Sequence, residues 1–208
     1  GRARGFPCRF PVTSTLPDAP AADLAAPVHT ACLGLGSNLG DSLQILHTAW
    51  DILRGETAIR AVRLSATYRS DPLGMQSVHR FVNAAALIHT ELAPFTLLAR
   101  LQRIESRCGR TRPSRGAAGY QDRTLDLDLL FYDDLVFRTA KLTLPHPRLH
   151  ERLFVLAPLA EIAPEWMHPL QGRTVADLRR DLLLAEPDQR VERIRWPFPP
   201  VAAAAPAP

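Results

Sequence analysis

The apolar positions change period several times along the chain, and each change predicts a new element. Residues 29–34 form an apolar run that leads into a Gly-rich stretch, which is typical of a strand entering a tight turn. Apolar residues then recur at the spacing of one helical face between Asp41 or Ser42, either of which can cap a helix, and Gly55, which ends it. The folded part therefore begins with a strand followed by a helix.

The next segments repeat this order with an additional strand. Residues 57–68 mostly alternate apolar and polar side chains, and residues 81–90 resume an extended apolar pattern. Pro94 stands where a first helical residue would, and apolar residues follow it at helical spacing before Gly109. Residues 125–129 then alternate leucine with aspartate, which predicts a further strand. The order strand, helix, strand, strand, helix, strand predicts a ferredoxin-like βαββαβ sandwich, an α+β fold with helices on one face of a mainly antiparallel sheet.

The remaining sequence predicts C-terminal helical additions and two ends without a fold. A hairpin is expected around Asp133 and Asp134, an apolar helix near residues 149–159, and a last helix opened by Thr174 in capping-box style. Prolines crowd both ends of the chain, as in segments that bury too little apolar surface to fold. We expect a disordered N-terminal extension at residues 1–29, the folded domain at residues 30–186, and a disordered Pro/Ala-rich tail at residues 187–208.

Composition narrows the class of protein. The chain has 208 residues, of which 46% are hydrophobic and 22% charged, as in one globular domain. No apolar stretch approaches the roughly 18–20 residues of a membrane-spanning helix. The three cysteines are scattered and form no C-x-x-C, which argues against a disulfide scaffold or a zinc module. With no secretory signal visible, we expect a cytoplasmic protein, a monomer, without a membrane partner.

The positive charge is concentrated in one segment. The net charge is +4, yet residues 100–123 hold seven arginines and only two acidic residues, Glu105 and Asp122. Such an excess suggests an anionic partner, although a solvated helix face that continues into a basic loop has the same composition. The loop at residues 109–122 holds three glycines and is long enough to close over a bound nucleotide. A merely disordered loop would explain those glycines equally well.

The sharpest chemical feature is the sequence T-L-D-L-D-L-L, which contains Asp126 and Asp128. Residues two apart on a strand project to the same face, so the two carboxylates are expected about 7 Å apart. Carboxylates are the ligands that Mg²⁺ takes, and two such ions can clamp a phosphate chain. Arg110, Arg112 and Arg123 flank the pair, and guanidinium groups suit phosphate oxygens. The alternative is a pair of solvent-facing aspartates on an edge strand.

Three further features have weaker signals. Asn83 stands amid apolar residues, where its amide needs a partner such as the edge of a planar heterocycle or a backbone group. His146 lies between two prolines on a rigid loop, which favours a contact role. The sequence G-L-G-S-N-L-G at residues 34–40 matches neither a dinucleotide-binding nor a phosphate-loop pattern, so we interpret it as a tight strand-to-helix turn.

Eight short sequences in collinear order resemble the family of 6-hydroxymethyl-7,8-dihydropterin pyrophosphokinases of folate synthesis. They are G-S-N-L-G-D (36–41), Y-R-S-D-P-L-G (68–74), F-V-N-A-A (81–85), Q-R-I-E (102–105), G-R-T-R (109–112), R-T-L-D-L-D-L-L (123–130), L-P-H-P-R-L-H-E-R-L-F-V-L-A-P-L (144–159) and E-I-A-P (161–164). The resemblance implies that residues 30–186 are a pyrophosphokinase domain with a ferredoxin-like fold. It also implies that ATP gives its pyrophosphoryl group to the hydroxymethyl group of the pterin and leaves as AMP.

The resemblance further implies roles for individual residues. Asp126 and Asp128 would hold two Mg²⁺ ions, and Arg110 and Arg123 would act beside them as catalytic groups. The positions that match ATP contacts are Gln102, Glu105, Arg110, Arg112, Arg123, Leu129 through its backbone, Lys141, Thr143, His146 and Arg152. The positions that match pterin contacts are Ser70, Asp71, Pro72, Leu73, Gly74, Phe81, Asn83 and Phe154, with the two phenylalanines on either side of the ring. The expected partners are then ATP and the pterin, without nucleic acid.

Three alternatives remain at this point. Nucleotidyl transferases also combine a Gly-Ser turn with D-x-D on a strand, but here the Gly-Ser lies about ninety residues before Asp126. A ferredoxin-like RNA-binding module could use the Arg-rich segment, although the K/R-G-F/Y-x-F pattern of such modules does not occur. A catalytically silent ATP-binding relative would keep the same residues. Dependence on the two aspartates distinguishes pyrophosphoryl transfer from RNA binding.

Overall fold

The computed structural model describes residues 27–74, 77–110 and 121–196. Arg112, one of the expected ATP contacts, lies outside these ranges, as does most of the loop expected to close over a nucleotide. The expected N-terminal extension also lies largely outside them, so its disorder stays a prediction. No helix within the described ranges has both the length and the apolar composition to cross a membrane.

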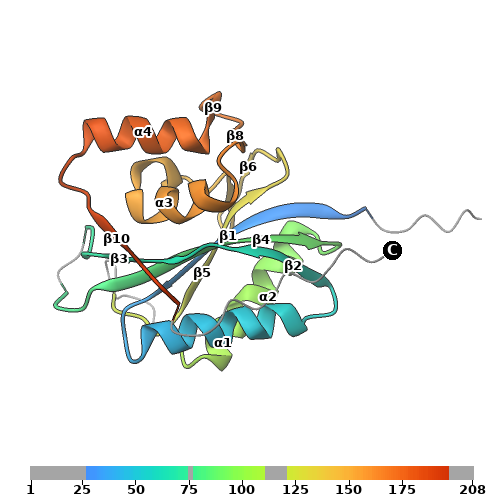
Figure 1. The fold of residues 1–208 in the computed structure, drawn as a ribbon. Coiled ribbons are helices and arrows are strands. Elements are labelled where there is room, and N and C mark those ends of the chain that lie inside the picture. Colours follow the sequence, from blue (N-terminus) through green and yellow to red (C-terminus); the bar gives the residue numbers. More distant parts are fainter. Residues whose placement is uncertain (1–26, 75–76, 111–120, 197–208) are drawn as a thin grey trace, which may run out of the picture.

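One antiparallel sheet runs through the centre of the molecule (Figure 1). Its strand order is β10-β3-β4-β1-β5, and β2 also pairs with β4. Every pairing in this sheet is antiparallel. The strands are β1 (His29–Ser37), β2 (Ile59–Leu64), β3 (Thr67–Ser70), β4 (Phe81–Thr90), β5 (Asp126–Tyr132) and β10 (Val191–Ile194). The protein is therefore a mixed α and β structure in which β1 and β4 are the central strands.

Helices cover both faces of this sheet. Helices α1 (Ser42–Gly55) and α2 (Pro94–Arg107) lie on one face, and α3 (Leu153–Ile162) and α4 (Val175–Ala185) lie on the other (Figure 1). The smaller elements are a short 3₁₀ turn (Leu149–Glu151) and two hairpins, β6 (Phe137–Arg138) with β7 (Thr143–Leu144) and β8 (Met167–His168) with β9 (Arg173–Thr174). The expectation of helices on one face is thus wrong for the molecule as a whole, because the C-terminal helices cover the second face.

The α1 and α2 layer follows the helical periodicity of the sequence. Asp41 is the N-cap of α1 and accepts a 3.1 Å hydrogen bond from the Gln44 amide. Pro94 is the first residue of α2, as expected. The fully buried residues of this layer that pack on one another include Leu33 on β1, Leu46 and Leu53 on α1, and Leu97 and Leu101 on α2. Alternate residues of each central strand therefore face this core.

The other residues of the same strands face α3 and α4. Cys32 on β1 and Phe131 on β5 belong to a second core with Leu156 and Leu159 of α3. Burial raises the pKa of the Cys32 thiol far above its ordinary value, so this cysteine is a neutral core residue. Because α3 buries most of its residues, it can lie flat on the sheet.

Two local expectations differ from the structure. The single strand expected at residues 57–68 is divided into β2 and β3, because the Ser65 hydroxyl accepts a 2.9 Å hydrogen bond from the Ala85 amide and donates to the Ala66 carbonyl. The hairpin expected around Asp133 is also displaced. Asp133 turns the chain with a φ of 45°, but the paired strands of the hairpin are β6 and β7, which come after it.

The predicted end of the folded domain at residue 186 is wrong. Strand β10 pairs with β3, and the Trp196 indole donates a 2.9 Å hydrogen bond to the Ser65 carbonyl. This partner lies 131 positions earlier in the chain. The proline content of the last residues indicated a tail without a fold. Strand β10 was not predicted because its partner is distant in the chain and no local pattern indicates such a pairing.

Candidate active site

A pocket opens on the α3 side of the sheet, at the end where β1, β4 and β5 carry small and polar residues. Two glycines of β1 form part of its floor. Gly36 pairs with Asn83 on one side and Asp126 on the other, and Gly34 stands between Ala85 and Asp128. A Cβ atom on Gly36 would lie 3.4 Å from Asn83 Oδ1 and 4.0 Å from the Asp126 Cβ. Glycine at this position therefore keeps the floor open between the amide and the carboxylate.

This corrects the interpretation of residues 34–40 as a tight turn. Strand β1 continues to Ser37, so Gly34 and Gly36 lie inside the strand and not in the turn after it. Two glycines at alternate positions of a predicted strand are the signal that could have located the pocket. Both lie on the same face of the strand, and neither has a side chain to fill the space above it.

Asp126 and Asp128 lie on the same face of β5 and both line the pocket. Asp126 accepts hydrogen bonds from the guanidinium groups of Arg110 and Arg123. Burial, together with the neighbouring charge of Asp126, raises the pKa of Asp128 to about 7. The two carboxylates therefore carry a repulsion that the arginines on Asp126 do not remove.

This repulsion fits a bound cation. Within the described residues, no group of three or more His, Cys, Asp or Glu side chains is arranged to hold a metal ion. A divalent ion at this pair would thus need further ligands, and phosphate oxygens are the hard ligands that Mg²⁺ takes besides carboxylates. The residues fit Mg²⁺ held jointly by Asp126, Asp128 and a polyphosphate.

Glu105 joins α2 to this pair of aspartates. Its side chain is only 3% exposed, accepts a 2.8 Å hydrogen bond from the Leu127 amide, and also accepts from Arg110. Arg110 therefore bridges a buried carboxylate on the helix and Asp126 on the strand. This buried ion pair fixes the end of β5 to α2.

The opposite wall of the pocket combines aromatic and amide groups. Phe81 from β4 and Phe154 from α3 line it together with Asn83. The Asn83 side chain is 5% exposed, and its Nδ2 donates a 3.0 Å hydrogen bond to Ser70 Oγ. The sequence had left open whether this amide has a protein partner or a ligand, and the structure shows a protein partner, Ser70. This hydrogen bond fixes the orientation in which Asn83 faces the pocket.

Arg152 connects the aromatic wall to the carboxylates. It is 8% exposed, lines the pocket, and has its Cζ atom 5.6 Å from the centroid of the Phe154 ring. His146 lies beside β5, where its backbone amide donates a 2.9 Å hydrogen bond to the Leu130 carbonyl. Burial, together with the charge of Arg152, lowers the pKa of His146 to about 4. His146 is therefore a neutral imidazole at physiological pH.

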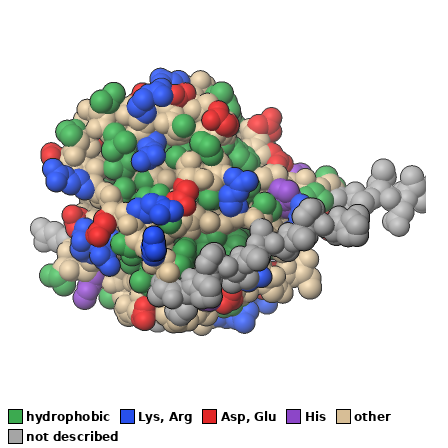
Figure 2. Space-filling view, viewed as in Figure 1, with side chains coloured by type: hydrophobic (Ala, Val, Ile, Leu, Met, Phe, Trp, Pro, Cys, Tyr) green, Lys and Arg blue, Asp and Glu red, His purple; other side chains and the backbone are tan. Residues whose placement is uncertain are grey.

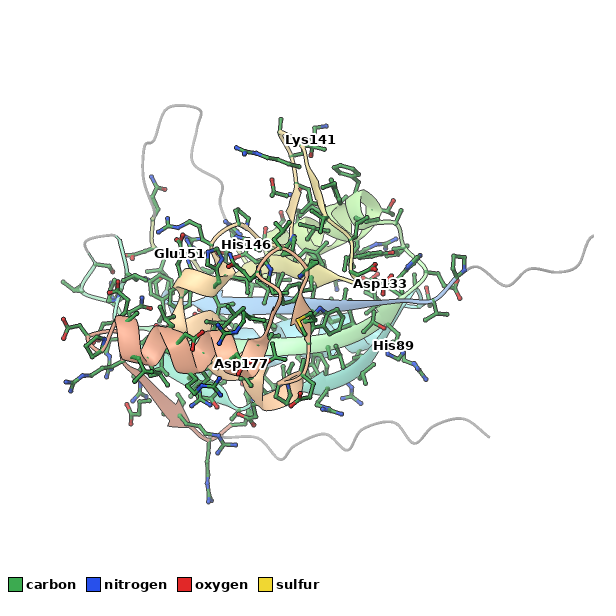
Figure 3. All side chains as sticks on the ribbon, turned by 90° about the horizontal axis from the view of Figure 1, so that it is seen from above. His89, Asp133, Lys141, His146, Glu151 and Asp177 are labelled. Carbon is green, nitrogen blue, oxygen red and sulfur yellow. The ribbon has the colours of Figure 1, made fainter. Side chains whose placement is uncertain are left out.

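The remaining expected ATP contacts stand further from the pocket. Lys141 is exposed at the tip of the β6–β7 hairpin, away from His146 (Figure 3). Leu129 is buried and its side chain belongs to the α1 and α2 core, which leaves only its backbone for a ligand.

The space-filling view shows basic and acidic side chains interspersed over the face formed by α3, α4 and β10 (Figure 2). That face therefore carries charges of both signs.

The pocket gathers half of the expected residues. Its lining includes Ser70, Asp71, Leu73, Phe81, Asn83, Arg123, Asp126, Asp128, Arg152 and Phe154. Pro72 lines a neighbouring groove beside Phe154. The other described positions outside its lining are Gly74, Gln102, Glu105, Arg110, Leu129, Lys141, Thr143 and His146. The sequence did not identify the rest of the lining, which consists of Gly34, Leu35, Gly36, Ala84, Leu130 and Val155.

Comparisons with known proteins identify relatives of this chain. Residues 32–164 match the family model described as 7,8-dihydro-6-hydroxymethylpterin-pyrophosphokinase. A relative from Bacillus subtilis named 2-amino-4-hydroxy-6-hydroxymethyldihydropteridine pyrophosphokinase is 43% identical over 135 residues, which are 65% of this chain and 78% of that protein. A relative of the same name from Pseudomonas aeruginosa is 39% identical over 162 residues, which are 78% of this chain and 94% of that protein.

Solved structures show the same fold at lower identity. The crystal structure of wild-type Plasmodium falciparum HPPK-DHPS with SDX-DHP superposes with a TM-score of 0.62 and 15% identity, and the match covers 78% of this chain and 46% of that chain. The present chain thus spans less than half the length of that solved chain. The match of the family model and the identity to the Pseudomonas relative place this chain in the 7,8-dihydro-6-hydroxymethylpterin-pyrophosphokinase family.

Proposed function

We propose that the protein transfers the pyrophosphoryl group of ATP to 6-hydroxymethyl-7,8-dihydropterin, giving the pterin diphosphate and AMP, in folate biosynthesis. The observation that carries this proposal is the single pocket that joins the carboxylates of Asp126 and Asp128 to the aromatic and amide wall of Phe81, Asn83 and Phe154. One end suits a metal-bound polyphosphate and the other a planar heterocycle with amide-like edges. The named relatives support the same assignment.

The phosphate end uses charge. Asp126 and Asp128 would hold two Mg²⁺ ions, which when bound neutralise phosphate charge and orient the chain. Arg110 and Arg123 contact Asp126. Their guanidinium groups therefore lie beside the carboxylate that would hold a cation, and their planar fork suits phosphate oxygens. Arg152 lies in the same pocket and provides a further positive charge.

The pterin end uses shape and hydrogen bonding. Phe81 and Phe154 offer ring faces for stacking, and Asn83, held by Ser70, offers a fixed amide to the edge of the heterocycle. Ser70 ends β3, and Asp71 and Leu73 directly after it border the same space. The Arg152 guanidinium lies against the Phe154 ring. A side chain suited to phosphate thus stands beside one suited to stacking on the pterin.

The reaction then depends on positioning and electrostatics. The hydroxymethyl oxygen attacks the β-phosphorus in line, an oxygen–phosphorus bond forms, the bond from the β-phosphorus to the AMP oxygen breaks, and the hydroxyl proton leaves to solvent. The guanidinium groups stabilise the charge that develops on the phosphate oxygens. His146, being neutral, adds no charge to this end of the site.

One structural assignment goes with the proposal. We propose the ferredoxin-like arrangement for β1 to β5 with α1 and α2. It is supported by the strand pairing, in which β2 and β3 both pair with β4, β4 pairs with β1, and β1 pairs with β5.

An RNA-binding module of that fold reads bases on an open face of its sheet. Here α3 and α4 lie on the face opposite α1 and α2, which disfavours the RNA-binding alternative.

Analysis of the nucleotide product tests the proposal. Purified protein is incubated with Mg²⁺, ATP and 6-hydroxymethyl-7,8-dihydropterin, and the nucleotides are separated. AMP that forms only when the pterin is present is the expected result, and it should be lost in Asp126→Ala and Asp128→Ala but retained in Asp51→Asn, an exposed aspartate on α1. ADP as the product would overturn the proposed reaction. ATP binding without turnover would identify a catalytically silent relative.

A further inference from the structure

Asn38 is a buried polar residue to which the proposed reaction gives no role. It follows the glycines of β1 and is 4% exposed. A buried amide is costly unless its donor and acceptor are both satisfied. Its partners are not in its own turn but 84 and 85 positions later in the chain.

Three hydrogen bonds join Asn38 to that later segment. Its Nδ2 donates to Asp122 Oδ1 at 2.6 Å, and its Oδ1 accepts from the Arg123 amide at 2.8 Å. Its own amide donates to the Arg123 carbonyl at 3.1 Å. Only a side chain with a donor and an acceptor on the same terminal group satisfies both side-chain contacts at once. Asparagine is therefore matched to this position by chemistry and not only by size.

The segment that Asn38 holds includes Arg123, a residue of the proposed site. Arg123 lines the pocket, and its guanidinium binds Asp126 through Nη1 and the Gln121 carbonyl through Nε at 3.1 Å. Asn38 fixes the backbone of Arg123 from the other side through both its N–H and its C=O. The position of the Arg123 guanidinium over the carboxylate thus depends on a backbone that Asn38 anchors to the end of β1.

We propose that Asn38 is a positioning residue that holds Arg123 in register with Asp126, so that the guanidinium meets the transferred phosphates. The inference rests on the proposed function, because it assigns Arg123 to the phosphate end of the pocket. Asn38 itself does not line the pocket. It acts on the reaction through the backbone of Arg123.

The first variant is Asn38→Asp, which keeps the shape and the acceptor but removes the donor. The new carboxylate would face Asp122 at the distance of the present 2.6 Å hydrogen bond, and the two charges repel. We expect the single-turnover rate of AMP formation to fall by about 10- to 100-fold, since a displacement of about 1 Å costs this much. The KM for the pterin should stay within about twofold, because Asn83 and the phenylalanines are untouched.

The second variant reverses the polarity of the bond. In Asn38→Asp combined with Asp122→Asn, the amide at position 122 donates to the carboxylate at position 38, and the Arg123 amide keeps its acceptor. We expect the rate to recover to within about threefold of the wild type. Asp41→Ala is the matched control: it removes the N-cap of α1 in the same turn but no bond to Arg123, so it should lower the melting temperature and leave the rate unchanged.

The outcomes separate this inference from the proposed function. A wild-type rate in Asn38→Asp, a double variant as slow as the single one, or a loss of rate in step with the fraction of unfolded protein would each overturn the positioning role. If the wild-type protein makes no AMP, the proposed function fails, and Asn38 is then tested by the dissociation constant for Mg-ATP. About tenfold weaker binding in Asn38→Asp, restored in the double variant, would support it, and unchanged binding would overturn it.

Discussion

The Tyr68 hydroxyl donates a 2.8 Å hydrogen bond to Glu161, 93 positions further along the chain. Glu161 also accepts a 3.1 Å hydrogen bond from the Ala66 amide and one of 3.1 Å from Arg193 on β10. One carboxylate on α3 thus holds both β3, which leads to residues 71–74 beside the pocket, and β10, the last strand of the sheet.

Glu161→Gln should lower the stability of the protein at neutral pH. Burial raises the pKa of Glu161, but the hydrogen bonds from Arg193 and Tyr68 outweigh it, and the net pKa is lowered. A carboxylate of this kind adds stability above its unfolded-state pKa of about 4.3 and loses it as the pH falls through the folded-state value. We expect a loss of about 1 kcal/mol in urea unfolding at pH 7 that shrinks below about pH 4. A difference that is the same at both pH values would contradict this explanation.

Asp128→Asn should abolish activity and yet stabilise the protein without metal. The pKa of Asp128 is raised, so the folded state holds its proton longer than the unfolded state, and stability falls as the pH rises from about 4 to about 7. Removing the charge should raise the melting temperature at pH 8 by roughly 2–4 °C, while AMP formation falls at least about 100-fold. Mg-ATP should stabilise the wild type but not the variant. A melting temperature below that of the wild type would show that the carboxylate pair is not in repulsion.

Gly36→Val should weaken pterin binding more than it disturbs the fold. Valine suits a strand, but its side chain would enter the pocket between Asn83 and Asp126, where even a Cβ lies 3.4 Å from the Asn83 oxygen. We expect the dissociation constant for the pterin to rise about tenfold or more. Gly55→Ala is the control, since nothing lies within 4 Å of a Cβ there. Unchanged pterin affinity in the valine variant would place the pterin elsewhere.

A chain that ends at Glu186 should be much less stable than one that ends at Trp196. The shorter chain lacks β10, the Trp196 hydrogen bond to Ser65, and Gln189, whose side chain accepts a 2.9 Å hydrogen bond from the Leu153 amide at the start of α3. We expect a difference of about 3 kcal/mol or more in thermal or urea unfolding. Comparing the full chain with the chain ending at Trp196 measures separately what residues 197–208 contribute. Equal stability of the two shortened chains would refute a structural role for β10.

Local patterns predicted many elements closely because their causes are local. The strand at residues 81–90 and the helix that begins at Pro94 match the structure at those bounds. Alternation and helical spacing are set by neighbouring residues, and the caps at Asp41 and Thr174 bond within three positions. The aspartate pair was visible for the same reason, since two residues two apart on a strand must share a face.

The tertiary structure decided what depends on distant partners. Strand β10 exists because β3 offers an edge, the glycines of β1 form a floor because Asn83 and Asp126 flank them, and Asn38 finds its donor and acceptor partners only when β1 lies beside β5. By itself, the sequence determined the periods, the caps and the carboxylate pair on β5. The pocket and its supports were fixed by folding, because hydrogen bonds and packing between residues far apart in the chain leave no periodic mark along it.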